Sequence, residues 1–396
     1  MDTSAVSATK AAEQRTVVST AFPLPIIATL VLILWPGQPS QAQAPLQALP
    51  GQANQTAQNE RAGAEAELQN GIALTRRGDF EEAIPHFLAA QGRVSNEFVL
   101  DFDLALCYVA TDQFKRAIPI LSALRSGGHA TADVYNLLAQ AHIGNAQPQE
   151  AFEAFQQAAA LNPKSEKLYL FVADACTDHQ YYTLGLDVVN LGLRDLPRSS
   201  RLYYQRGVLY SFMDRPDLAR DALQEASKLA PGSDISYLAA AQKGMLEGNM
   251  PEATQAAREG VQKNPKDYIL LTILGQALIR SGVGPGQPEF AEAQAALERA
   301  ATERPNFGAA QLGLGQLNLM AGRLNEAIAH LDTARQLAPG NPAVYSHLAM
   351  AYQRRGKLQE AQEMLAILAR LNKEQAAKYK SGPPDQKASY MGSGVK

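Results

Sequence analysis

The chain has 396 residues, of which 46% are hydrophobic and 19% are charged, and its formal net charge is -3. This composition is typical of a folded protein and excludes general disorder. The small negative charge gives no long-range attraction to nucleic acid or to anionic lipid, so we expect neither as a partner.

The N-terminal segment has the pattern of a secretory signal. An uninterrupted apolar run covers residues 26–35, about half of the roughly 20 residues that a helix needs to cross a bilayer. Small residues then favour cleavage after Ala42. Residues 1–44 are therefore predicted to be a signal peptide with its cleavage region, and the protein to be exported to the periplasm or outside a bacterial cell. The alternative is an uncleaved segment, residues 21–35, that anchors the chain in the inner membrane.

From residue 64 onward, two features recur every 34 residues: a small residue near the start of the second helix, and a proline after that helix. One insertion of six residues lengthens the step from Ala253 to Ala293. In units three to eight a proline follows the second helix at a fixed phase and is expected to end it. The small residue is found at Ala83, Ala117, Ala151, Gly185, Ala219, Ala253, Ala293, Ala327 and Ala361. The proline is found at Pro163, Pro197, Pro231, Pro265, Pro305 and Pro339.

This pattern resembles the tetratricopeptide repeat (TPR), a helix-turn-helix unit of 34 residues. Other marks of the family are a small residue at position 8, as in Gly207 and Gly275, glycine at position 15, as in Gly248, and a large apolar residue at position 24, as in Leu223. The resemblance implies an all-α fold, a right-handed superhelical solenoid of antiparallel helix pairs. Nine units fit: 64–97, 98–131, 132–165, 166–199, 200–233, 234–267, 268–307, 308–341 and 342–375.

The physical pattern within a unit agrees with this resemblance. Apolar residues at positions 4, 7, 8 and 11 form one face of helix A, and those at 20, 24 and 27 form one face of helix B. Small residues at positions 8 and 20 are expected to let the two helices approach closely, and the next unit covers the remaining apolar surface. Pro85 and Pro119 fall inside helix B of the first two units and are expected to kink or loosen it.

The segments outside the regular units have simpler predictions. Residues 45–63, rich in Gln, Ala and Pro, are predicted to be a flexible tether. The insertion in unit seven, "SGVGPGQPEF", is predicted to be a long turn between two helices. Lys373 replaces the terminating proline of unit nine, so the last helix is expected to continue through residues 376–380 as a polar cap. The tail, residues 381–396, is predicted to be disordered.

Residues that could carry chemistry are few. Cys107 and Cys176 lie two units apart and are expected to be free, semi-buried thiols. Cys176 and His179 have a spacing that could supply two zinc ligands, but no second half of such a site is visible, and a core role for Cys176 is favoured. With no catalytic motif, the sequence indicates a protein that is not an enzyme and has no cofactor or metal.

The concave surface of a TPR superhelix is lined by positions 2, 5, 9 and 12 of helix A. Here glutamine recurs at position 9, and such amides can pair with the main chain of an extended peptide without reading its sequence. The alternatives remain that these glutamines are only soluble helix formers and that the aromatic residues only pack. The predicted groove residues are Gln140, Gln242, Gln276, Gln316, Phe102, Tyr204, Phe212 and Met245.

We therefore expect an exported, non-catalytic scaffold that binds a protein or an extended peptide in its concave groove. The alternative function is that of a structural or assembly factor of a cell-envelope complex, which acts through its convex face or by self-association. A membrane contact is expected only through an uncleaved N-terminal segment. The fold alone supports protein binding and no particular pathway.

Overall fold

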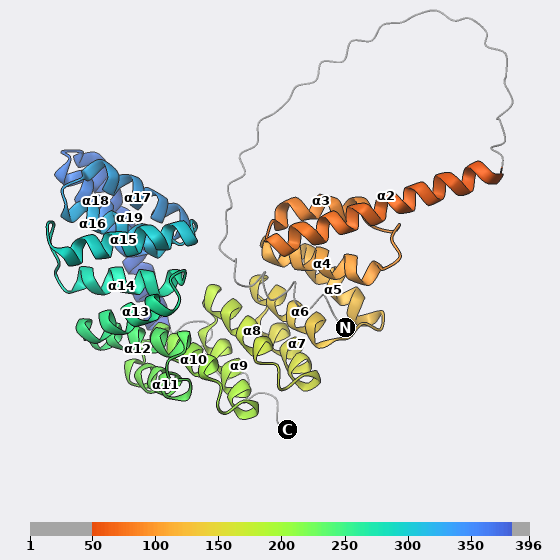
Figure 1. The fold of residues 1–396 in the computed structure, drawn as a ribbon, viewed down its shortest axis with the longest axis horizontal. Coiled ribbons are helices and arrows are strands. Elements are labelled where there is room, and N and C mark those ends of the chain that lie inside the picture. Colours follow the sequence, from red (N-terminus) through yellow and green to blue (C-terminus); the bar gives the residue numbers. More distant parts are fainter. Residues whose placement is uncertain (1–49, 382–396) are drawn as a thin grey trace, which may run out of the picture. The chain divides into compact units, whose positions relative to one another are not determined.

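A computed structural model describes the backbone of residues 50–381 and the side chains of residues 58–374. Within this range the chain is entirely helical, with eighteen α-helices and no strand (Figure 1). The chain divides into two compact units, residues 1–107 and residues 108–396, and the division falls inside one helix, α4. The predicted signal peptide, its cleavage region and the C-terminal tail from residue 382 lie outside the described residues.

The helices of the first unit are α2, α3 and most of α4, and α2 packs against α3. The second unit contains the end of α4 and all later helices, and each helix from α5 onward packs against the next one in the chain. In order, the helices of the first unit are α2 (Pro50–Arg77), α3 (Phe80–Ala90) and α4 (Glu97–Ala110). Those that follow are α5 (Phe114–Ser126), α6 (Ala132–Gly144), α7 (Pro148–Leu161), α8 (Glu166–Asp178), α9 (Tyr182–Asp195), α10 (Ser200–Phe212) and α11 (Pro216–Leu229). The last eight are α12 (Asp234–Glu247), α13 (Met250–Lys263), α14 (Tyr268–Arg280), α15 (Pro288–Glu303), α16 (Gly308–Met320), α17 (Leu324–Leu337), α18 (Pro342–Arg354) and α19 (Leu358–Ser381).

Glycine at position 8 faces the large residue at position 24 of the same repeat, as the sequence pattern predicted. A Cβ atom added at Gly207 would lie 2.7 Å from Cγ of Leu223, and one added at Gly315 would lie 2.5 Å from Cγ of Leu331. Both leucines are fully buried. The missing side chain therefore sets the distance between helix A and helix B, because no real Cβ fits at that separation.

Position 15, directly after helix A, has a positive φ in all nine repeats. Five repeats place glycine there, which adopts this left-handed conformation without steric cost. The other four have Asp112, Ala146, Gln180 and Asp214, with φ between 54° and 63°. Ala146 closes α6 with two backbone bonds, from its own N–H to Ile143 and from Gln147 N–H to His142, the pairing of a Schellman turn.

Ala146→Gly is expected to stabilise the protein by about 1 kcal/mol, because it removes the clash that the left-handed conformation imposes on an alanine side chain. The urea midpoint of the variant, followed by circular dichroism, checks this. Ala366→Gly is the control: Ala366 is exposed inside α19, where glycine costs about 1 kcal/mol. A midpoint for Ala146→Gly that does not exceed that of the parent would contradict the strain.

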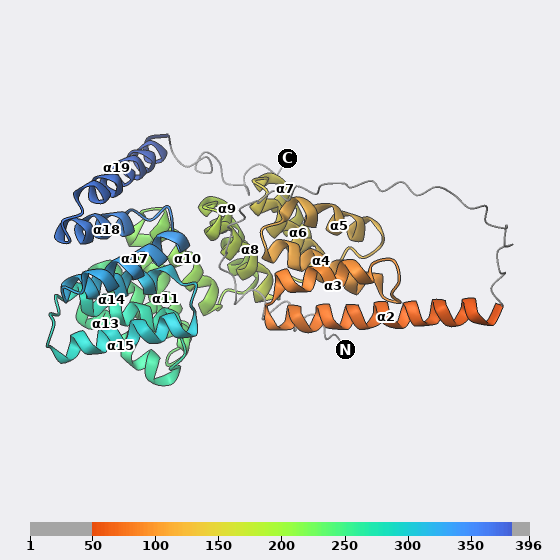
Figure 2. The same cartoon turned by 90° about the horizontal axis from the view of Figure 1, so that it is seen from above.

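Two predictions need correction, those on the tether and on the burial of the cysteines. Residues 50–63 were expected in a flexible tether, but they belong to α2, which extends well past α3 in Figure 2. Their Ala, Gln, Glu and Arg side chains are good helix formers, and none of residues 51–63 is a proline. Pro85 and Pro119 lie inside α3 and α5, and both helices continue through them. Cys107 and Cys176 are not joined in a disulfide, as expected, but they are fully buried instead of semi-buried.

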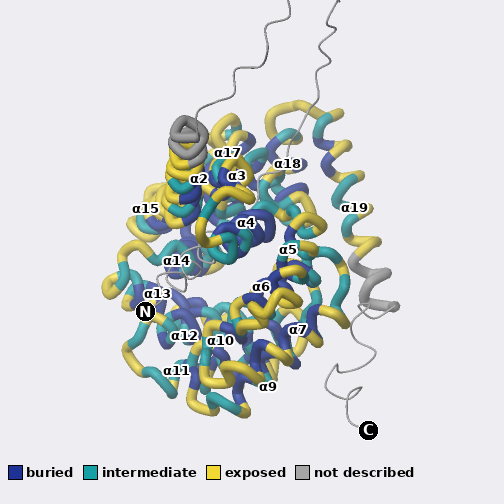
Figure 3. The backbone as a smooth tube through the Cα atoms, turned by 90° about the vertical axis from the view of Figure 1, so that its right-hand side faces the viewer, coloured by how far each residue is buried: buried dark blue, intermediate teal, exposed yellow. Residues whose placement is uncertain are grey.

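The insertion of unit seven and the end of the last repeat agree with prediction. The insertion forms the turn between α14 and α15, where Gly282 and Gly286 have positive φ and Val283 is buried in the adjoining core. The last helix, α19, runs on to Ser381. Figure 3 shows it coloured largely exposed or intermediate over its described residues, as expected for an end cap.

Candidate functional site

Helix A of each repeat in the C-terminal half of the second unit lies beside helix A of the next. α12 contacts α14, α14 contacts α16, and α16 contacts α18. Each helix start is fixed locally: Ser233 and Asp267 accept hydrogen bonds from backbone N–H groups in the first turns of α12 and α14, which caps those helices. Equivalent positions on these four helices therefore form rows that run from repeat to repeat.

The row at position 9 contains Gln242, Gln276 and Gln316, all of which are half-buried. Nε2 of Gln316 lies 2.7 Å from Nε2 of His347, at position 6 of the next repeat. Burial lowers the pKa of His347, so its ring is neutral at pH 7 and can accept this bond.

Gln242 and Gln276 differ from Gln316 in this respect. Over the described residues, neither side-chain amide has a hydrogen-bond partner. The residues at position 6 of the repeats that follow them are Ile273 and Gly313, and neither has a polar side chain. These two amides are therefore available to a bound molecule.

Gln140, the fourth predicted glutamine, is buried in the second unit. Its Nε2 donates to Oδ1 of Asn136 at 2.8 Å, and Nδ2 of Asn136 donates to the carbonyl oxygen of Leu168 at 2.9 Å. Through Asn136, Gln140 therefore takes part in a buried contact between two repeats. We leave it out of the candidate site.

The four predicted apolar residues have different surroundings. Phe102, in the first unit, is buried and stacks on Phe98, with ring centroids 6.1 Å apart. Met245 is half-buried against the core around α14. Phe212 is 56% exposed and stacks on Tyr182, with centroids 5.2 Å apart and an interplanar angle of 3°. Met245 and Phe212 are accessible, whereas Phe102 is not.

Tyr204 packs against two buried clusters, one from α11 and α12 and one from α12 to α16. Burial raises the pKa of its phenol, with smaller contributions from Asp267 and Asp174. It therefore serves mainly as a packing residue, which was one of the two readings of the sequence.

A polar and aromatic cluster beside Tyr204 was missed. Nη1 of Arg304 donates to the hydroxyl of Tyr268 at 2.8 Å, and the guanidinium carbon lies 4.9 Å from the ring centroid. The rings of Phe307 and Tyr268 lie edge-on to each other, with their centroids 4.9 Å apart. Burial raises the pKa of Tyr268, while Arg304 lowers it. These residues occupy positions 1 and 31 and the end of the repeat, which the groove pattern does not include, so no signal in the sequence marked them.

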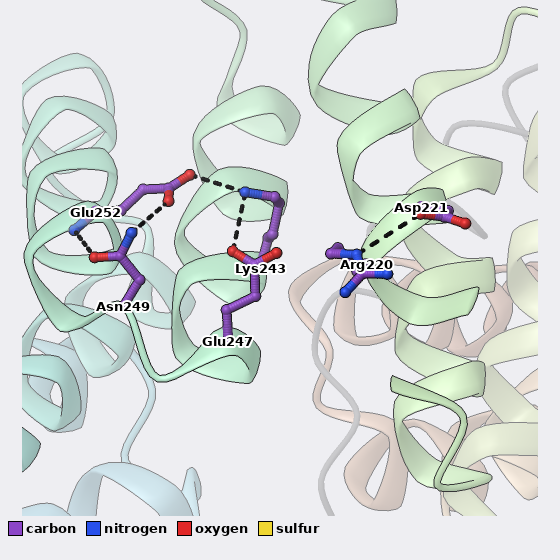
Figure 4. A network of polar contacts seen from close by, with 6 residues as sticks. All are labelled: Arg220, Asp221, Lys243, Glu247, Asn249 and Glu252. Carbon is purple, nitrogen blue, oxygen red and sulfur yellow. Dashed lines mark hydrogen bonds and ion pairs between the residues drawn. The ribbon is translucent and has the colours of Figure 1, made fainter. Parts of the chain in front are cut away.

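Lys243 of α12 forms ion pairs with two carboxylates of the protein. Its Nζ lies 3.1 Å from Glu247 and 3.1 Å from Glu252, and its side chain is 20% exposed (Figure 4). Its pKa is raised: burial, the largest influence, acts downward, but the hydrogen bonds from both carboxylates outweigh it. Asn249 caps α13 by accepting from Glu252 N–H and donating back to its carboxylate. The charge of Lys243 is therefore held by Glu247 of its own helix and Glu252 of α13.

The described residues contain neither a metal-binding cluster nor a helix that could span a membrane. No cluster of three or more His, Cys, Asp or Glu side chains there could hold a metal ion. His179, half of the Cys-x-x-His spacing, packs edge-on against Phe114 at 5.5 Å. No helix in the same part of the chain is long and apolar enough to span a membrane.

Stacked helix pairs with an accessible row of amides define a helical-repeat scaffold for protein-protein interactions. Sequence profiles of the tetratricopeptide repeat match residues 132–165, 200–233, 286–342 and 318–381, and the first two ranges coincide with predicted units three and five. The chain is a tetratricopeptide repeat protein with many helix-pair repeats. None of the matched segments is a catalytic domain.

Two curated proteins match part of the chain at low identity. The chain is 22% identical over 204 residues to the BBSome complex member BBS4 of Bos taurus, covering 52% of this chain and 38% of that protein. For the Mus musculus protein the identity is 25% over 127 residues, covering 32% and 24%. The chain thus spans well under half the length of these relatives.

One solved structure supports the fold, and another is similar over part of this chain. The APC/C hetero-tetramer Cut9-Hcn1 matches with a TM-score of 0.50 and 15% identity, covering 81% of this chain and 66% of that one. A thermophilic TPR protein of Thermus thermophilus matches with a TM-score of 0.40 and 21% identity, covering 46% and 97%. The predicted all-α fold of sequential helix pairs is confirmed.

Proposed function

We propose that this TPR scaffold binds an extended segment of a partner protein along the row of amides on α12, α14 and α16. The observation that carries the proposal is the pair of half-buried glutamines, Gln242 and Gln276, whose amides have no partner within the described chain. An amide supplies both a donor and an acceptor, which is what a peptide main chain requires. Met245 and Ile279, half-buried at position 12 of α12 and α14, add apolar surface beside them.

The test is the double variant Gln242→Ala/Gln276→Ala in the full chain. It is expected to bind its partner about tenfold more weakly, because two neutral hydrogen bonds are lost at about 0.5–1.5 kcal/mol each. Capture from extract identifies the partner, and titration calorimetry with the purified partner measures the change.

The matched control is Gln255→Ala/Gln362→Ala, which removes two exposed amides from B helices. Circular dichroism first establishes that both variants keep their helicity. Equal affinity of the two double variants would exclude the amide row as the binding site.

Export remains part of the proposal. It rests on the apolar run 26–35 and the small residues before Ala42, and it would place the scaffold in the periplasm or outside the cell, or at the inner membrane through residues 21–35 if the signal is not cleaved. N-terminal sequencing of the protein from its native host separates these outcomes, since cleavage after Ala42 leaves Gln43 as the first residue.

A second candidate is an assembly subunit that acts through its B helices or by self-association. It is favoured by two exposed leucines on B helices, Leu161 at 56% and Leu218 at 43%, and the two mammalian relatives are named as members of a complex. A mass that rises with concentration in sedimentation equilibrium, and returns to one chain in Leu161→Ser/Leu218→Ser, would support this function over the first.

A further inference from the structure

Charge is distributed unevenly over the A helices of the second unit. At positions 2, 5, 9 and 12, α6, α8 and α10 carry Asp133, Lys167, Asp174 and Arg201. The same positions of α12, α14, α16 and α18 carry no Asp, Glu, Lys or Arg, and α16 has no such residue anywhere along its thirteen positions. The amide row thus lies in an uncharged surface that continues over four consecutive repeats.

Lysine and arginine side chains at other positions of these helices are bound to groups of the protein itself. Lys243 is held between Glu247 and Glu252. Nη1 of Arg280 donates to the carbonyl oxygen of Met245 at 3.2 Å, and Nη1 of Arg354 donates to that of Leu319 at 2.9 Å. Both arginines thereby satisfy carbonyl groups in the last turn of the preceding A helix, where a cation is favourable.

Within this surface, position 5 is closed on α12, α14 and α16, and most of the positions in the other rows are open. Leu238, Thr272 and Leu312 are all buried at position 5. Residues at positions 2 and 9, among them Ile235, Ile269 and the glutamines, are half-buried. Position 12 is open on α12, α14 and α18, whereas Leu319 closes it on α16. We call the open positions, 2, 9 and 12 of α12, α14 and α18 and 2 and 9 of α16, the amide strip.

A charged side chain laid on the amide strip would lose water without meeting an opposite charge. Burying an ion without a partner costs several kcal/mol, whereas an apolar or amide side chain has no such penalty. Neighbouring helices lie about 8–10 Å apart and an extended chain advances about 3.3 Å per residue. The axes of the first and third glutamine-bearing helices are two spacings apart, so an extended segment crosses from one to the other in about five to six residues.

Resting on the proposed function, we propose that the amide strip selects an extended partner segment that carries no charged side chain over these residues. The glutamines hold its main chain, and the missing counter-charges exclude acidic and basic sequences. The specificity of this scaffold then comes from excluding segments with charged side chains.

The test uses a phage-displayed library of random twelve-residue peptides, selected on the full chain and sequenced. Recovered peptides that depend on Gln242 and Gln276 are expected to be depleted several-fold in Asp, Glu, Lys and Arg relative to the starting library. Two variants then change the charge of the strip: Gln276→Glu should enrich Lys and Arg, and Gln276→Lys should enrich Asp and Glu. Gln255→Glu on α13 is the control and should leave the selected composition unchanged.

Each other outcome overturns a defined part of the proposal. Charged residues at library frequency, in peptides that still require Gln242 and Gln276, would leave the proposed function intact and exclude the selectivity. Peptides indifferent to Gln242→Ala/Gln276→Ala would exclude the amide strip as the site, and with it the proposed function. Absence of enrichment would exclude both as well, and a concentration-dependent dimer that is lost in Gln242→Ala/Gln276→Ala would identify a second copy of the chain as the occupant of the strip.

Discussion

Leu297→Ala will destabilise the seventh and eighth repeats by about 3 kcal/mol. The Leu297 side chain is fully buried on α15 and fills the space between two glycines on neighbouring A helices. Its Cγ lies 2.5 Å from the place a Cβ would take on Gly275, and its Cδ1 lies 2.8 Å from that place on Gly313. Removing it loses apolar burial and leaves a cavity, which together cost about 2–5 kcal/mol for buried leucines. Urea unfolding followed by circular dichroism measures the loss.

The reverse change tests the same contact from the other side. Gly275→Ala places a methyl group against Leu297 and is expected to cost about 1–3 kcal/mol, the usual range for overpacking. In the double variant, Leu297→Ala opens the space that the new methyl group needs. The double variant is therefore expected to lose at least 1 kcal/mol less than the two single variants together.

The control for this pair is Leu365→Ala. Leu365 is the position-24 residue of the ninth repeat, but it lies 41% exposed on α19, so truncation there should change stability by about 0.5 kcal/mol or less. Strictly additive losses for Gly275→Ala and Leu297→Ala would show that the glycine does not set the distance between the helices.

This contact also shows how much of the fold the sequence predicts. The pairing of position 8 with position 24 follows from the 34-residue register, and every helix pair follows from it. Two of the four non-glycine residues with positive φ at position 15 do not follow, because nothing in Ala146 or Gln180 indicates a left-handed conformation; Asp112 and Asp214 adopt it more readily. At Ala146 and Gln180 the packing of the repeat imposes a backbone that the local sequence does not favour. The start of α2 was missed because a Gln- and Ala-rich segment suits both a tether and a helix.

The candidate site was less predictable, since a position in the register does not say what lies opposite a side chain. Asn136 and Gln140 are four residues apart on one helix, and this spacing could have indicated their hydrogen bond. The contact between Gln316 and His347 spans 31 residues and depends on how two repeats stack. The distinction between occupied and available glutamines therefore required the structure.

Asp103→Asn will make the first unit more stable at pH 8 while changing little near pH 4. Burial raises the pKa of the Asp103 carboxyl to about 7, and the Arg76 charge offsets this only in part. In the unfolded chain the pKa returns to about 3.9. Because the folded state keeps a proton that the unfolded state has released, stability falls as pH rises from about 4 to about 7, and the contribution is constant above that.

The total loss is at most about 4 kcal/mol, since each pKa unit corresponds to about 1.4 kcal/mol. The pKa of Asp101 on the same helix is raised as well, first by burial and then by Glu97, so the variant should reduce the slope without abolishing it. Hydrogen exchange of the α4 amides at pH 5 and pH 8, corrected for intrinsic rates, measures the difference. Glu82→Gln, an exposed change on α3, should leave the slope as it is. If protection of α4 in the parent rose between these pH values, the carboxyl would be ionised and stabilised in the folded protein, and its burial would not control the first unit.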